Sequence, residues 1–246
     1  LSGRLERFAV GSSELADDQR NTIENRLARL YLEKLDRPAD ALTHAAALLD
    51  REIDHSDARA IARTVLERPA DSDEAKATRV RAAEVLERVY LARDEARELD
   101  EVTAIRLAES PSLGKEERLE LLRRLARLRD ERLADDAGAL DALAQLVPLD
   151  AADEEARKTL LSVGRRANAH ARVAEVLGQA ADVSGDASLE ADILVEQAAV
   201  FENLLSDDAS AERVYRRILG LKDESGAPAE AQRAPALKAL ERIYEA

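Results

Sequence analysis

Two stretches of this 246-residue chain repeat the same pattern of large and small apolar residues, 98 positions apart. Residues 27–42 read LARLYLEKLDRPADAL and residues 125–140 read LARLRDERLADDAGAL. A third and weaker copy, QAAVFENLLSDDASAE, follows a further 72 positions along the chain at residues 197–212. Such self-similarity is typical of repeat proteins, because one short unit cannot bury its apolar face alone and must stack on the next.

The apolar residues within the repeats have helical spacing. Two rows run along residues 115–133 at intervals of three, four and seven positions: Leu119, Leu122 and Ala126 in one row, and Leu121, Leu125 and Leu128 in the other. These intervals place each row on one side of a helix. Together the two rows form a wide apolar stripe, which predicts a helix that contacts more than one neighbour.

The same spacing predicts helices along nearly the whole chain, separated by short turns. We expect an all-α fold, a right-handed superhelical solenoid of antiparallel helix pairs with about 12 helices. Aromatic residues make up only 2% of the chain, and the 9 Gly and 6 Pro are too few for the turns of an all-β protein. The predicted helices are 17–35, 38–51, 56–68, 73–91, 94–109, 115–133, 136–147, 152–166, 169–182, 187–205, 208–220 and 229–245.

Prolines and aspartates mark the predicted helix ends. Pro38 is expected just inside a helix start, where its missing N–H costs nothing. Pro69, Pro111 and Pro148 are expected to end the helices before them, and Pro235 is an alternative start for the last helix, which is predicted from residue 229. The pairs Asp17-Asp18, Asp135-Asp136 and Asp207-Asp208 lie where N-caps are needed.

One solenoid domain, residues 1–246, accommodates all the copies. Its repeat units are predicted at about 17–109, 115–182 and 187–246. The two offsets, 98 and 72 residues, differ by 26 residues, which is about one helix with its turn. The first unit is therefore predicted to contain an added helix, within residues 56–91.

The repeats resemble those of the tetratricopeptide family. That family has a large residue, a small residue and an aromatic residue in the first helix of each pair, and a small residue in the second. Leu27, Ala28, Tyr31 and Ala41 fit this pattern. The segment LERVYLARDEARELDEV at residues 86–102 also resembles the long repeat proteins of large-genome soil bacteria, which implies a bacterial origin.

The resemblance implies a concave groove lined by the first helix of each pair. Groove positions flank the small residue of that helix, and side chains there could bind a peptide backbone or a terminal carboxylate. The alternative is that these side chains are only solvated surface. The implied groove residues are Asn25, Arg29 and Glu33 in the first copy, Arg123, Arg127 and Glu131 in the second, and Val195, Ala199 and Asn203 in the third.

No catalytic, cofactor or metal-binding residues are predicted. The chain has no Cys, and it contains no Walker A, GxSxG, GxGxxG or HExxH motif. Asp54, His55 and Asp57 could share a cation, but a helix cap from Ser56 or Asp57 is the simpler interpretation. An enzyme built on the solenoid is kept as a third hypothesis, without a convergent set of residues to support it.

The net charge of −14 and the isoelectric point near 4.8 argue against binding to nucleic acid. Five Arg fall within residues 123–132, but interleaved Glu and Asp favour ion pairing along the helix. No apolar stretch reaches the roughly 20 residues of a membrane span, and no signal peptide is visible. A cytoplasmic location is favoured. Because the chain begins at Leu1, we expect it to be a piece of a longer protein.

Two functions are expected. The first is a scaffold that binds a partner protein or peptide in its concave groove. The second is a structural module that self-associates through its terminal helices, because a terminal repeat should be polar on its outer side. The last helix instead carries an apolar face, which consists of Ala236, Leu237, Leu240, Ile243 and Tyr244.

Overall fold

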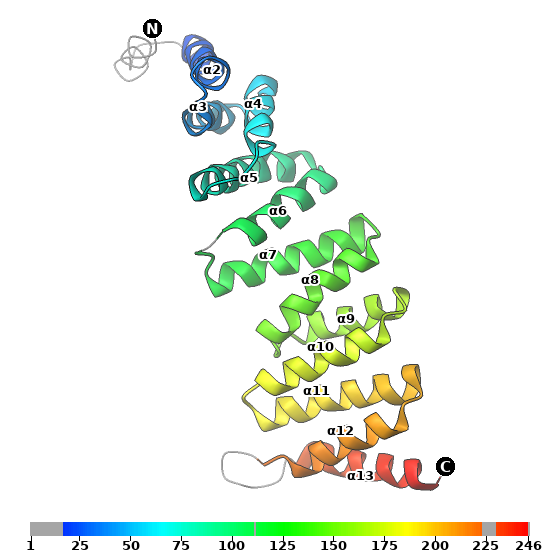
Figure 1. The fold of residues 1–246 in the computed structure, drawn as a ribbon. Helices are drawn as coiled ribbons and strands as arrows, with labels where there is room; N and C mark the ends of the chain where they lie inside the picture. Colours follow the sequence, from blue (N-terminus) through cyan, green and yellow to red (C-terminus); the bar gives the residue numbers. More distant parts are fainter. Residues whose placement is uncertain (1–16, 111, 223–229, 246) are drawn as a thin grey trace. The chain divides into compact units, whose positions relative to one another are not determined.

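The computed structural model describes residues 17–110, 112–222 and 230–245 of the chain (Figure 1). Within these ranges it has twelve α-helices, two short π-helical segments and no β-strand. Every predicted helix is present, and the described helix ends agree with the predicted ends to within two residues. The prediction of an all-α fold with about 12 helices is confirmed.

The chain forms two compact units, which divide between residues 114 and 115. The helices of unit 1 are α2 (Asp17–Glu33), α3 (Pro38–Arg51), α4 (Ser56–Leu66), α5 (Asp73–Arg93) and α6 (Ala96–Glu109). The helices of unit 2 are α7 (Lys115–Arg127) with η1 (Leu128–Arg132), α8 (Asp136–Leu149), α9 (Glu154–Arg166), α10 (His170–Val183), α11 (Ala187–Val200) with η2 (Phe201–Leu205), α12 (Asp208–Gly220) and α13 (Glu230–Glu245).

Consecutive helices pack against one another within each unit, as in a helical-repeat solenoid (Figure 1). Contacts also join helices that are two apart: α2 with α4 and α3 with α5 in unit 1, and α8 with α10 and α11 with α13 in unit 2. Each helix pair therefore buries its apolar stripe against the pair that follows, as the repeat pattern predicts. The single-domain assignment, the three repeat units and the added helix within residues 56–91 stay predictions.

Three turns have the same backbone conformation, and they lie at the offsets of the sequence repeats. Asp36, Ala134 and Ser206 each adopt a left-handed conformation, with φ of 49°, 51° and 52°. They are 98 and 72 positions apart, like the aligned sequences. In each turn the next N–H bonds back to the carbonyl six residues earlier, at 2.9 Å: Arg37 to Tyr31, Asp135 to Arg129, and Asp207 to Phe201. The three copies therefore share one helix–turn–helix geometry.

The small residues of the repeat lie where the two helices of a pair are in contact. Six alanines occupy these positions, and none exposes more than 3% of its surface. They are Ala28, Ala126 and Ala198 in the first helices and Ala41, Ala139 and Ala211 in the second. A larger side chain at these positions would force the helices apart or distort the packing of the core.

Several predicted helix ends are confirmed. Pro38 is the first residue of α3. Asp135 caps α8 by accepting a hydrogen bond from the Gly138 N–H at 2.9 Å. Asp207 caps α12 in the same way, through the Ser210 N–H. Pro111 lies outside the described residues.

Two predictions about proline were wrong. Pro148 does not end the helix before it, because α8 continues to Leu149. Pro235 does not begin the last helix, because α13 already starts at Glu230. Pro148 is the next-to-last residue of α8 and Pro235 is the sixth residue of α13, and each removes one N–H donor from its helix. The burial of Ala236 and Leu240 after Pro235 helps to hold that helix together.

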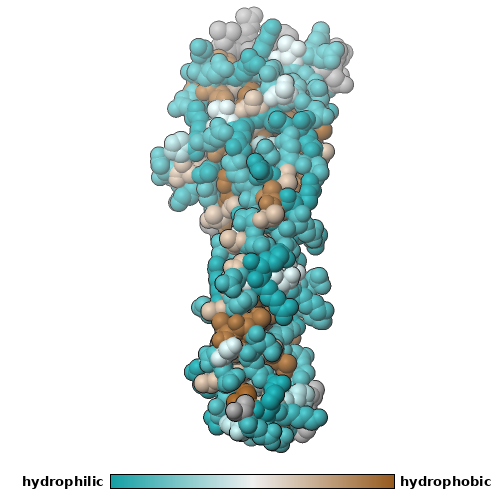
Figure 2. Space-filling view, turned by 90° about the vertical axis from the view of Figure 1, so that its right-hand side faces the viewer, coloured by the Kyte–Doolittle hydropathy of each residue, from teal (hydrophilic) through white to brown (hydrophobic). Residues whose placement is uncertain are grey.

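The expected apolar face of α13 is smaller than predicted. Ala236 and Leu240 are buried inside unit 2, while Leu237 and Tyr244 are 45% and 60% exposed. The face shown in Figure 2 is mostly hydrophilic, with small apolar patches. Among the described residues, no helix has the length and the apolar character needed to cross a membrane.

Replacing Ala134 by glycine should stabilise unit 2 by about 0.5–1 kcal/mol. The left-handed conformation strains a Cβ-bearing residue, and glycine removes that strain. The same change at Ala137, the exposed second residue of α8, should instead destabilise because glycine is a poor helix former. Urea unfolding followed by circular dichroism measures both changes, and two changes of the same sign would contradict the assignment.

Candidate functional site

The predicted groove residues of the first copy meet on a single carboxylate. Nδ2 of Asn25 and a guanidinium nitrogen of Arg29 both donate to Oδ2 of Asp57, at 2.8 and 2.7 Å. These hydrogen bonds hold the pKa of the Asp57 carboxyl below its ordinary value, and the hydrogen bond from Asn25 has the largest effect. Asn25 and Arg29 therefore join α2 to α4. Glu33 lies in the last turn of α2 and is exposed.

In the second copy, Arg123 makes a comparable bridge. Its Nε donates to Oδ2 of Asp153 at 2.7 Å, and another nitrogen pairs with Asp150. Burial alone would raise the pKa of the Asp153 carboxyl, but the hydrogen bonds from Arg123 and from the Ala156 N–H hold it below its ordinary value. Arg123 thus joins α7 to the start of α9.

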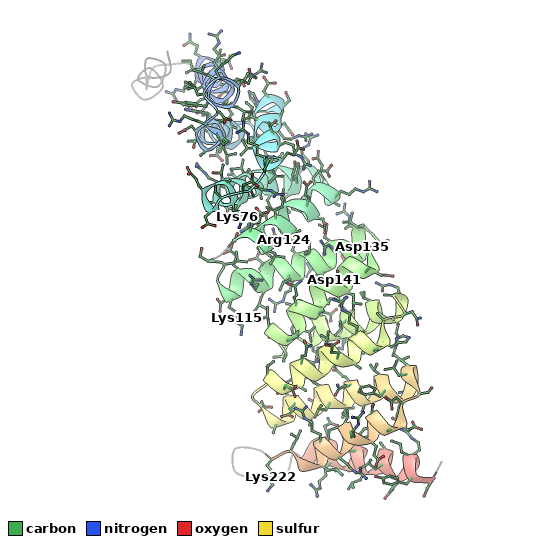
Figure 3. All side chains as sticks on the ribbon, in the orientation of Figure 1. Lys76, Lys115, Arg124, Asp135, Asp141 and Lys222 are labelled. Carbon is green, nitrogen blue, oxygen red and sulfur yellow. The ribbon has the colours of Figure 1, made fainter. Side chains whose placement is uncertain are left out.

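The second-copy residues Arg123, Arg127 and Glu131 lie together in one open groove of about 380 Å³ on α7 and η1. Arg127 and Glu131 are exposed, and the guanidinium of Arg127 makes no hydrogen bond or ion pair with another described residue. Figure 3 labels Arg124, a further lining residue on α7. The complete lining is Glu120, Arg123, Arg124, Arg127, Leu128, Glu131 and Arg132.

The third copy does not repeat this polar surface. Asn203 is exposed on η2, and its side chain donates to the Ala199 carbonyl of its own helix at 3.0 Å. Val195 and Ala199 are half-buried and offer no polar group. The predicted residues of the second copy therefore lie together in one groove. In the first copy two of them bind Asp57, and in the third copy the predicted positions offer few polar groups to a ligand.

Bridges between alternate helices continue along both units. Arg59 on α4 pairs with Glu95 before α6 at 3.0 Å, and Arg157 on α9 pairs with Glu196 on α11 at 3.0 Å. These arginines occupy equivalent positions, 98 residues apart. Arg157 is only 5% exposed and also donates to the Ala151 carbonyl. Burial raises the pKa of the Glu196 carboxyl despite its pairing with Arg157.

The sequence did not predict the larger groove, which lies on unit 1 and measures about 540 Å³. Two of its walls come from α4 and α6, where Arg63 pairs with Glu101 at 2.6 Å. Tyr90 of α5 also lines the groove, and burial raises the pKa of its hydroxyl. The spacing of Arg59 and Arg63, four positions apart, could have indicated a charged face on α4. The lining is Asp54, Ser56, Arg59, Ala60, Arg63, Tyr90, Arg93, Glu95, Arg97, Glu98 and Glu101.

His55 has a structural role. His55 is itself the N-cap of α4, with Nδ1 accepting from the Ala58 N–H at 3.2 Å, so the expected cap from Ser56 or Asp57 was wrong. The imidazole reaches that N–H because it lies at the first non-helical position. Among the described residues, no three His, Asp or Glu side chains converge to hold a metal ion.

His44 of α3 contacts two side chains of α2. Its Nδ1 lies 2.6 Å from Oε2 of Glu24, and its ring stacks on Tyr31 with the centroids 5.4 Å apart. The hydrogen bond with His44 is the main reason that the pKa of the Glu24 carboxyl lies below its ordinary value of 4.5. The two side chains are 18% and 15% exposed, so this contact is mostly shielded from water.

Replacing Arg157 by leucine should destabilise unit 2 by about 2–3 kcal/mol, because Glu196 and the Ala151 carbonyl would lose their shared donor. The matched control is Arg172→Leu, also in unit 2. Arg172 pairs with Asp141 at 2.6 Å, but its side chain is 47% exposed. That change should cost less than about 1 kcal/mol. Equal losses of unfolding free energy for the two variants would show that the burial of Arg157 does not increase its contribution to stability.

The depressed pKa of Glu24 makes its contribution to stability pH-dependent. A carboxyl whose pKa is lowered on folding stabilises the fold above its unfolded value of 4.5, and this contribution is lost as the pH falls through the folded value. Glu24→Gln should therefore destabilise unit 1 at neutral pH and converge on the parent as the pH falls below 4.5. Urea unfolding across this pH range tests this, with exposed Glu33→Gln as the control that should leave stability nearly unchanged at neutral pH.

Comparison with known proteins assigns the chain to no family. No family model matches the sequence, and no curated protein matches it. Membership of the tetratricopeptide family therefore rests on the repeat pattern around Leu27, Ala28, Tyr31 and Ala41 and stays a proposal.

Proposed function

We propose that this protein is an interaction scaffold that binds a partner protein or peptide along the exposed first helices of its pairs. We further propose that these pairs are tetratricopeptide-like and of bacterial origin. Three observations support the repeat assignment: the matched left-handed turns at Asp36, Ala134 and Ser206, the buried alanines at the helix contacts, and Tyr31, which is 2% exposed at the aromatic position.

The observation that carries the binding proposal is the groove on α7 and η1. It is open to solvent and lined by arginines from one helical face together with Glu120 and Glu131. Arg127 is the best placed to bind a ligand, since its guanidinium makes no bond with another described residue. A guanidinium has five N–H donors and can bind a carboxylate or several backbone carbonyls.

The charges define the class of partner. Arg127 supplies a positive charge, and Glu131, one helical turn along, supplies a negative one. A peptide segment with charges of both signs complements this pair. Nucleic acid is a poor partner under this proposal, because the chain carries a net charge of −14 and would repel a polyanion.

The proposal assigns binding rather than catalysis to these grooves. In the groove of unit 1, the acidic side chains Glu95 and Glu101 are engaged by Arg59, Arg93 and Arg63. The hydrogen bond from Arg93 is the main reason that the pKa of the Glu95 carboxyl lies below its ordinary value. Glu95 is then a poor general acid or base near neutral pH.

Self-association through a terminal helix is the alternative proposal. It is supported by the exposure of Leu237 and Tyr244 on α13. It is weakened by the burial of Ala236 and Leu240, which removes two of the five residues of the apolar face that the sequence indicated.

Arg127→Glu should weaken capture of the partner at least tenfold without changing stability, because an arginine at the centre of an interface often contributes more than about 1.4 kcal/mol. Arg165→Glu is the matched control. Arg165 is an exposed arginine of unit 2 that does not line the groove. The assay is quantitative mass spectrometry of proteins captured from the native source. A partner lost equally with both variants, or with neither, would place binding elsewhere.

Arg29 and Arg123 are unsuitable for that test. Both are ion-paired between helices, Arg29 with Asp57 and Arg123 with Asp150 and Asp153. A charge reversal at either position would therefore place like charges in contact and disturb the packing of alternate helices.

A further inference from the structure

The sequence of α13 repeats that of α5. Residues 79–90 read RVRAAEVLERVY and residues 233–244 read RAPALKALERIY. Six of the twelve positions are identical: the first Arg, an Ala, the run Leu-Glu-Arg, and the final Tyr. The two helices belong to different units, so each can be compared with its own neighbours.

The inner faces of the two helices are used in the same way. Ala82 and Leu86 of α5 are fully buried, and their counterparts Ala236 and Leu240 of α13 are 0% and 7% exposed. The arginine of the motif also has the same role in both helices. Arg88 pairs with Asp50 on α3, and Arg242 pairs with Glu202 on η2, so each reaches back past one helix to the segment before it.

The outer faces differ in exposure. In α5, Ala83, Glu87 and Tyr90 are 0%, 6% and 3% exposed. Their counterparts in α13 are all exposed: Leu237 at 45%, Tyr244 at 60%, and Glu241 between them. These three residues, Leu237, Glu241 and Tyr244, form the α13 face.

In unit 1, helix α6 covers the corresponding face of α5. It packs on α5 through Leu99, Val102 and Ile105, which are spaced three apart and are each no more than 8% exposed. Ion pairs fix its position, one between Arg106 and Glu87 and another between Glu109 and Arg79, the latter at 2.9 Å. The covering helix is thus amphipathic, with a basic residue directly after the last of the three aliphatic residues.

We propose that the α13 face binds an amphipathic helix of a partner protein, in the way that α5 binds α6. The partner helix presents aliphatic side chains at intervals of three, which cover Leu237 and Tyr244. It also presents an arginine or lysine that pairs with Glu241, as Arg106 pairs with Glu87. This surface is separate from the groove on α7 and η1, so it does not depend on binding there.

The α13 face is already ordered for such a contact. The Tyr244 hydroxyl donates to Oε1 of Glu212 at 2.8 Å and accepts from Arg216 at 3.0 Å, which fixes the ring against α12. An ordered aromatic side chain loses little conformational entropy on binding. Leu237 adds apolar area where α5 has only Ala83, so the face offers more apolar surface than its counterpart.

The natural probe is the covering helix of unit 1. A fluorescent peptide of residues 95–110, EARELDEVTAIRLAES, is titrated with the full chain and followed by anisotropy. Binding should be saturable but weak, because a free peptide of this length must also form its helix. Leu237→Glu should reduce affinity at least tenfold. The matched control is Leu91→Glu, which changes a 50% exposed apolar residue of α5 that is not part of the α13 face, and it should change nothing.

A charge exchange tests the ion pair. Glu241→Arg should weaken binding of the parent peptide, and a peptide in which Arg106 is replaced by Glu should restore it.

No saturable binding up to ~1 mM would overturn the proposal. Equal binding by the parent and Leu237→Glu would do the same, because the peptide would then occupy another surface. Sedimentation velocity tests whether the face instead binds a second copy of this chain. Self-association of the parent that is lost in Leu237→Glu would make a second copy the occupant and overturn a partner helix.

Discussion

The structure depends on small residues that are buried in the matched helix pairs. In each of the three pairs, one alanine from the first helix and one from the second are buried, as with Ala28 and Ala41. A small side chain at a helix contact lets the two helices approach closely and pack without gaps. A pair by itself would leave its leucines in water, so each pair is stable only with a neighbour. This explains why a core that is poor in aromatic residues can still be well packed.

Arginine–carboxylate bridges complete the contact between alternate helices, and they occupy the surface on which binding was expected. Asn25, Arg29 and Arg123 were predicted to bind a partner, yet each holds an aspartate of a later helix or turn. A residue that serves stability in this way can bind a ligand only by giving up its internal bond. Arg127 is in a different position, since no described residue competes for it. Selection for binding is therefore expected to act on the few charged side chains that the bridges leave available.

Much of the fold could be predicted from the sequence, because local patterns determine it. Apolar spacing placed the helices, and the aspartates before them marked their starts, as Asp135 and Asp207 show. The side-chain bridges could not be predicted. Arg157 and Glu196 are 39 positions apart, and their contact depends on how successive pairs are stacked. The same limit applies to Pro148, because α8 continues to Leu149, beyond the position at which the local sequence alone would end it.

The left-handed turns have a practical consequence. Their shape is set by backbone hydrogen bonds, and the side chains of Ala134 and Ser206 point into solvent. The chain has no cysteine of its own. Cysteines introduced at these two positions would therefore be the sole thiols of the molecule, at corresponding points of two hairpins in unit 2. Dyes attached there would report the distance between the two turns, and a change in that distance under load would show how far this stack of helices stretches or twists.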